Sequence, residues 1–144
     1  MSKVLSLRLK EDQVERLERA ARRWGRSPSS AAVLLLEEAL RQREFPYVEF
    51  RDSVVGRQAY LNGHRLTVWQ IEWIARYFDH DAGKTADYLR IRPVQVEGAL
   101  SYADAYPEEI EYAIADNDRT YEELKRMIPN LQLFEFHDVD SDSA

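Results

Sequence analysis

The chain has no cysteine among its 144 residues and only five glycines, which are scattered. Disulfides, thiolate nucleophiles and cysteine-based zinc sites are therefore excluded, and no glycine-rich phosphate loop is present. No apolar run approaches the ~20 residues that span a membrane. Charged residues interrupt the first apolar positions, which is not the pattern of a signal peptide. These absences predict a cytoplasmic protein with no membrane partner.

Groups for catalysis are scarce as well. The three histidines are His64, His80 and His137, and two of them precede an aspartate in dyads that lie far apart in the sequence. Metal ligation needs more ligands than such isolated dyads offer. Aspartates alternate over residues 138–142, but no glycine and no following glutamate complete a calcium loop. We expect a protein that is not an enzyme and that has no metal and no cofactor.

Charge is distributed unevenly along the chain. The formal net charge is -6. Up to Pro46 there are 10 Lys and Arg against 7 Asp and Glu, and the remainder of the chain holds 10 against 19. A basic end and an acidic end indicate two binding tasks, one of them directed at an anionic partner.

The first 45 residues follow a strand–helix–helix pattern. Leu5, Leu7 and Leu9 alternate with polar or smaller residues over 3–9, which predicts a short strand with one apolar face that needs a partner strand. Apolar residues at spacings of three and four predict a helix over 11–24, with arginines on its other surfaces and Gly25 as its stop. Ser27 as N-cap and Pro28 at the first turn start a second helix that runs to about Arg43.

This order of elements resembles the ribbon-helix-helix family of repressors and antitoxins over Lys3 to Arg43. The resemblance implies a homodimer whose paired strands enter the major groove of operator DNA. Arg8 is the sharpest candidate because arginine binds guanine bidentately. The start of the second helix would hold a phosphate. The predicted DNA-binding residues are Lys3, Val4, Ser6, Arg8, Lys10, Arg26, Ser27 and Ser29. The alternative for the arginines is a solvated face.

After a predicted linker over 46–53, the second half begins with a hairpin. Asn62-Gly63 predicts a type I′ turn between short apolar runs. Thr67 caps a helix over about 68–78, and further helices are predicted over 83–89, from Pro93 to 105, from Pro107 onward, and over 120–127. The fold class is therefore mainly α with short strands: a ribbon-helix-helix domain over 1–45 and a helix-turn-helix-like domain over 54–119, followed by a tail over 120–144 whose end is disordered.

The second half resembles the domain-of-unknown-function 433 family, which is described as VapB-like antitoxins. The resemblance covers Val54 to Ala105 and is carried by Gly56-Arg57, by the segment 63–68 and by the helices that follow. It implies a PIN-like ribonuclease toxin as partner. Apolar residues of the tail are the predicted toxin-binding set: Leu124, Met127, Ile128, Leu131, Leu133, Phe134 and Phe136. The alternative is that these residues pack on their own domain.

Together these patterns predict an antitoxin. Its dimeric N-terminal domain would bind operator DNA to repress its own operon, and its C-terminal region would neutralise the ribonuclease toxin. The alternative is a stand-alone ribbon-helix-helix transcription regulator whose second domain oligomerises or senses a ligand.

Overall fold

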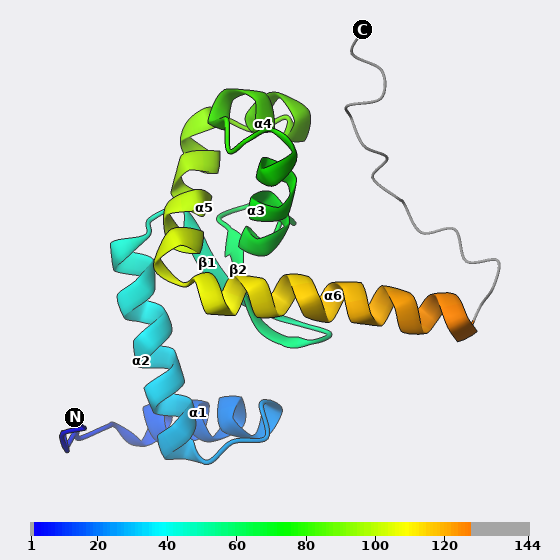
Figure 1. The fold of residues 1–144 in the computed structure, drawn as a ribbon. Coiled ribbons are helices and arrows are strands. Elements are labelled where there is room, and N and C mark those ends of the chain that lie inside the picture. Colours follow the sequence, from blue (N-terminus) through cyan, green and yellow to red (C-terminus); the bar gives the residue numbers. More distant parts are fainter. Residues whose placement is uncertain (1, 128–144) are drawn as a thin grey trace, which may run out of the picture. The chain divides into compact units, whose positions relative to one another are not determined.

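The computed structural model describes residues 2–127, which form six α-helices and one two-stranded antiparallel sheet (Figure 1). The chain divides into two compact units, Met1–Glu44 and Phe45–Ala144. The predicted fold class, mainly helical with short strands, is confirmed at this level. No helix within residues 2–127 combines the length and the apolar character needed to cross a membrane.

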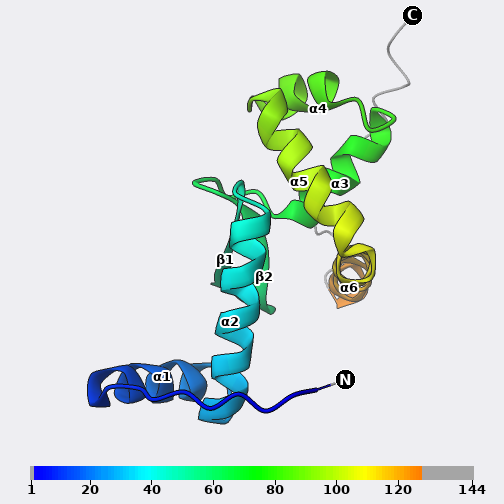
Figure 2. The same cartoon turned by 90° about the vertical axis from the view of Figure 1, so that its left-hand side faces the viewer.

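The first unit contains α1 (Glu11–Arg23) and α2 (Pro28–Glu44). Gly25 has a φ of 62°, and the amide of Arg26 donates to the carbonyl of Ala21 at 2.9 Å. Together with a bond from the amide of Gly25 to the carbonyl of Arg22, this is the Schellman arrangement that closes a helix. The predicted glycine stop is therefore confirmed, and it redirects the chain into α2 at a steep angle (Figure 2).

Much of the apolar surface of the first unit is not covered in a single chain. Ala21 and Ala31 are its buried apolar residues, whereas the side chains exposed on its helices include Val14, Val33, Leu35, Leu36 and Leu40. Residues 3–9 are in neither a helix nor a strand. A strand needs a neighbour for its backbone hydrogen bonds, and the described residues 2–44 contain no strand.

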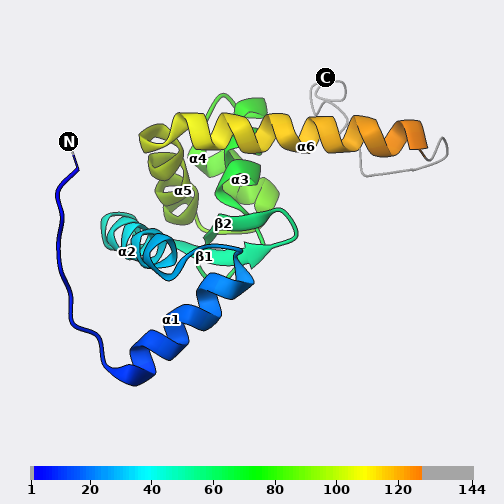
Figure 3. The same cartoon turned by 90° about the horizontal axis from the view of Figure 1, so that it is seen from below.

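The second unit begins with a hairpin of β1 (Val48–Ser53) and β2 (Gly56–Leu61). Four helices follow it: α3 (Val68–Tyr77), α4 (Ala82–Leu89), α5 (Pro93–Ala105) and α6 (Pro107–Met127). Figure 3 shows α6 passing across α3 and α5. The helices that start at Pro93 and Pro107 begin at the predicted residues, because proline fits the first helical turn and no later position.

The hairpin differs from the prediction in two ways. In place of a linker over 46–53 the structure has β1, whose Val48 pairs with Leu61 of β2. The hairpin turn lies at Val54-Val55, where Ser53 Oγ accepts from the amide of Val55 at 3.2 Å and donates to the carbonyl of Gly56 at 2.7 Å. A serine side chain thus supplies turn bonds that two valines do not favour.

Asn62-Gly63 forms a second, smaller turn. The amide of His64 donates to the carbonyl of Leu61 at 3.0 Å, and a single bridge joins Tyr60 to Thr67. Gly63 has a positive φ but Asn62 does not. A type I′ turn requires positive φ at both residues, so the predicted turn type is wrong.

The core of the second unit lies between the hairpin and the helices. Its fully buried large side chains are Leu61, Val68, Ile71, Val96 and Tyr102. Ile71, Ile74 and Ala75 are buried as the helical spacing of α3 predicts, whereas Trp69 and Phe78 are only partly buried. Tyr102 packs edge-on against Phe45 and Phe50 and donates its hydroxyl to Glu109 Oε2 at 2.5 Å. The single polar atom of this ring is therefore satisfied inside the core.

One continuous helix replaces the two predicted over 107–127. No proline or glycine lies between Pro107 and Met127. Asp116 forms an ion pair with Arg119 at 2.5 Å, and the carbonyl of Asp116 accepts a hydrogen bond from the hydroxyl of Thr120 at 2.9 Å. These bonds hold α6 together across Asn117, a poor helix former. The predicted domain end at 119 therefore falls inside a helix.

Close packing against Tyr47 leaves no room for a side chain at Gly98 on α5. A Cβ built on it would lie 2.7 Å from Cδ2 of Tyr47. We predict that Gly98→Ala lowers the free energy of unfolding by about 1–3 kcal/mol through overpacking, despite the better helix propensity of alanine. Thermal unfolding followed by circular dichroism measures this. Ser101→Ala, at an exposed position of the same helix, is the control and should be neutral; a Gly98→Ala variant more stable than the parent would contradict the packing account.

Candidate nucleic-acid interface

The N-terminal segment presents both faces of its alternating pattern to solvent. The predicted groove-facing residues Val4, Ser6 and Arg8 are exposed, and so are Lys3 and Lys10 at its ends. Leu5 and Leu7 are also exposed, by 75% and 71%. A contiguous exposed row of apolar side chains marks an interaction surface. The single chain thus offers a row of leucines and, opposite it, the row of Val4, Ser6 and Arg8.

The start of α2 holds the predicted phosphate-binding residues. Ser27 is its N-cap: the amide of Ser30 donates to Ser27 Oγ at 3.1 Å. Arg26 Nη1 donates to Ser30 Oγ at 3.2 Å, which places a guanidinium beside the helix end. Ser29 is exposed and its amide lies in the first turn, where no intrahelical acceptor exists. The structure therefore brings Arg26, Ser27 and Ser29 together at a helix N-terminus whose dipole favours an anion.

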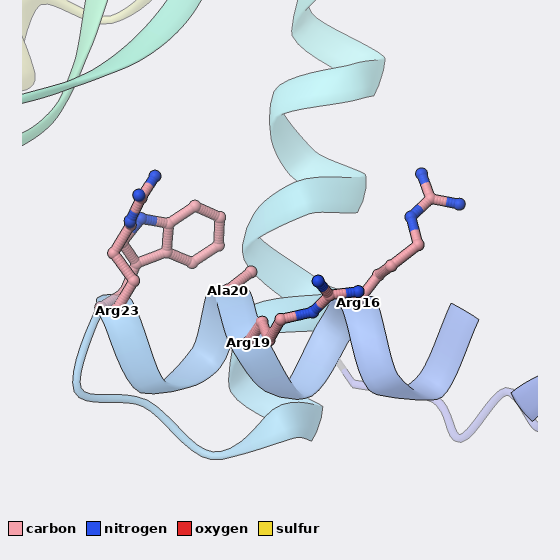
Figure 4. Close-up of a pocket in the computed structure, with 5 residues that line it drawn as sticks. Arg16, Arg19, Ala20 and Arg23 are labelled. Carbon is pink, nitrogen blue, oxygen red and sulfur yellow. The ribbon is translucent and has the colours of Figure 1, made fainter. Parts of the chain in front are cut away.

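Arginines on α1 form a feature that was not among the predicted site residues. Arg16, Arg19 and Arg23 surround Ala20 and, with Trp24, line a depression of about 490 Å³ (Figure 4). We call these three arginines, with Ala20 and Trp24, the arginine face. The signal in the sequence is the spacing of the arginines at i, i+3 and i+7, which places them on one side of a helix.

The second unit contains a polar network between two helices. The Glu72 carboxylate pairs with Arg76 at 3.6 Å and contacts His80 Nε2 at 2.9 Å, and Arg76 also pairs with Glu111 of α6. The hydrogen bond to Glu111 raises the pKa of Arg76, and partial burial opposes that effect. This network ties α3 to α6. Within residues 2–127 no cluster of three or more His, Asp or Glu side chains is arranged to hold a metal ion.

The segment 63–68, which carries the second resemblance, has structural roles. Thr67 Oγ1 accepts from the amide of Gln70 at 3.2 Å, which confirms the predicted cap of α3. Val68 is buried, and His64 Nε2 lies 3.2 Å from Nε2 of Gln95 on α5. These contacts join the loop after β2 to two helices.

The predicted toxin-binding residues lie mostly beyond the described part of the chain. Leu124 and Met127 belong to the last turns of α6. The others fall outside the described residues: Ile128, Leu131, Leu133, Phe134 and Phe136. In the first turns of α6, the buried Ile110 and Ile114 attach the helix to the core, and residues 117–120 are exposed.

Comparison with known proteins adds no assignment. No family model, no curated protein and no solved structure matches the chain.

Proposed function

We propose that this chain is a homodimeric DNA-binding regulator of the ribbon-helix-helix type. One observation carries the proposal: leucines alternate with Val4, Ser6 and Arg8 over residues 3–9, and both rows are exposed in a single chain. Antiparallel pairing with a second copy satisfies the backbone of each segment and directs all the leucines to one face. The exposed apolar residues of α2 extend the surface that a second copy would cover.

The other face of the paired ribbon would then carry Val4, Ser6 and Arg8 from each copy into the major groove. Arg8 would bind guanine O6 and N7, Ser6 would form a single hydrogen bond, and Val4 would contact a thymine methyl. The N-terminus of α2, with Arg26, Ser27 and Ser29, would fix the dimer on flanking phosphates. Two-fold symmetry of the dimer implies an operator with an inverted repeat.

Substitution of Arg8 tests the base contact. We predict that Arg8→Ala weakens binding to the DNA upstream of the gene by about 1–3 kcal/mol for each half-site, while the dimer stays intact. A gel-shift titration measures affinity, and sedimentation measures the dimer. Arg65→Ala is the matched control, because Arg65 is an exposed cation of the second unit. Unchanged affinity of the Arg8→Ala protein would remove Arg8 from the interface.

The second candidate function is that of an antitoxin that binds a PIN-like ribonuclease. Its support is the charge of the chain after Pro46, where 19 acidic residues face 10 basic ones, and the exposed residues 117–120 of α6. An acidic region suits the basic surface of a protein that cleaves RNA. The short turn between α4 and α5, with Arg90 in the left-handed region, fits the helix-turn-helix-like domain of this proposal. We assign that domain to structure or dimerisation, because exposed Glu97 and Asp104 on α5 disfavour phosphate binding.

Truncation separates the two functions. We predict that a chain ending at Arg119 keeps its DNA affinity but no longer neutralises the toxin encoded beside it. The truncated protein retains Ile110 and Ile114, so the core of the second unit is preserved. Co-expression with the neighbouring gene, scored by growth and by residual ribonuclease activity, is the measurement. Full rescue of growth by the truncated chain would refute the tail's role in toxin binding. If the full-length chain does not bind the product of the neighbouring gene, the antitoxin proposal fails and the stand-alone regulator remains.

A further inference from the structure

The arginine face has the geometry of a surface for several anions in a row. Successive arginines are three and four residues apart on α1, so their Cα atoms rise by roughly 4.5 Å and 6 Å along the helix. Ala20 lies between them and contributes only a methyl group. Figure 4 shows Arg16 and Arg23 extending away from the helix on either side of Ala20, with the side chain of Arg19 running along the helix toward Arg16. A chain of anions can therefore reach all three cations from one side.

Ion pairs among the described residues do little to neutralise Arg16 and Arg19. Arg16 pairs with Asp12 at 3.9 Å, and both side chains are more than two-thirds exposed. Such a pair contributes little to stability. Arg19 forms no ion pair with any described residue. Arg16 and Arg19 lie one helical turn apart, so their like charges repel each other, and an external anion would offset that repulsion.

The geometry points to the phosphate backbone of double-stranded DNA as the ligand of the arginine face. All three cations are arginines, whose planar guanidinium binds phosphate oxygens bidentately. They belong to the same 44-residue unit as the proposed groove-reading segment. The inference rests on the proposed DNA-binding function and extends it: the arginine face adds contacts that are independent of base sequence, whereas Arg8 contributes base recognition.

The test is the salt dependence of binding to a labelled 30-base-pair duplex of random sequence, followed by fluorescence anisotropy. The variant carries Arg16→Gln, Arg19→Gln and Arg23→Gln, since glutamine keeps the helix propensity. The matched control removes three exposed cations of the second unit through Arg65→Gln, Lys84→Gln and Arg126→Gln. The single variant Arg19→Gln guards against loss of fold in the triple variant, because Arg19 has no ion pair to lose.

Each phosphate contact contributes about 0.9 to the slope of log K against log salt concentration. The triple variant should therefore lose about 2.7 from the slope for each copy of the face that engages, and Arg19→Gln about 0.9. Between 50 and 200 mM salt the parent should accordingly lose about 40-fold more affinity than the triple variant for each copy of the face that engages. The control should keep the parent slope.

Equal slopes for the parent and the triple variant would overturn the inference. The inference would also be overturned if the three arginines were needed to bind polyglutamate and the duplex did not bind. The arginine face would then recognise an acidic protein. Failure of the proposed base contact can be told apart from failure of this inference. If Arg8→Ala does not change the affinity for the upstream DNA but the salt slope still falls in the triple variant, the arginine face is supported and the base contact is refuted.

Discussion

The proposed dimer follows from one constraint: an extended segment cannot leave both its backbone groups and a row of leucines without partners. Leucines occupy every second position from Leu5 to Leu9, and in a single chain residues 3–9 are exposed and outside any strand. Neither helix of the first unit covers them. A second copy of the same segment satisfies the backbone and the leucines together, and the two-fold symmetry that results also determines where Val4, Ser6 and Arg8 point. The dimer and the proposed DNA contact therefore follow from the same requirement.

The two units divide the chemistry of the chain. The first carries the basic surplus, with its cations on the N-terminal segment, on the arginine face and at the start of α2. The second is acidic and has a core of its own, closed by Tyr102 and by the ion pairs of Arg76. Its polar side chains mostly hold helices together. Its proposed binding function is therefore assigned to the end of α6, which begins with the exposed residues 117–120, and to the residues that follow.

Sequence patterns predicted those helices that have strong local signals. Pro28, Pro93 and Thr67 mark helix starts, because a proline or a capping hydroxyl satisfies the first turn locally. The strand β1 was missed although Val48 and Phe50 alternate with charged residues, since Pro46 made the stretch resemble a connection. The position of the hairpin turn depends on side-chain bonds of Ser53, which composition does not reveal. To predict the arginine face, the spacing of the arginines on one side of α1 has to be combined with the small size of Ala20. Spacing alone does not reveal the depression.

The most direct test of the central claim is the molar mass of the chain in solution, measured by light scattering at micromolar concentration, with Leu7→Asp as the comparison. The account predicts that the parent has twice the mass of one chain. It predicts that Leu7→Asp is a monomer, because an aspartate would be buried between the helices and the ribbon. A monomeric parent, or a Leu7→Asp protein that is still a dimer, would contradict the pairing of residues 3–9 and with it the proposed DNA-binding surface.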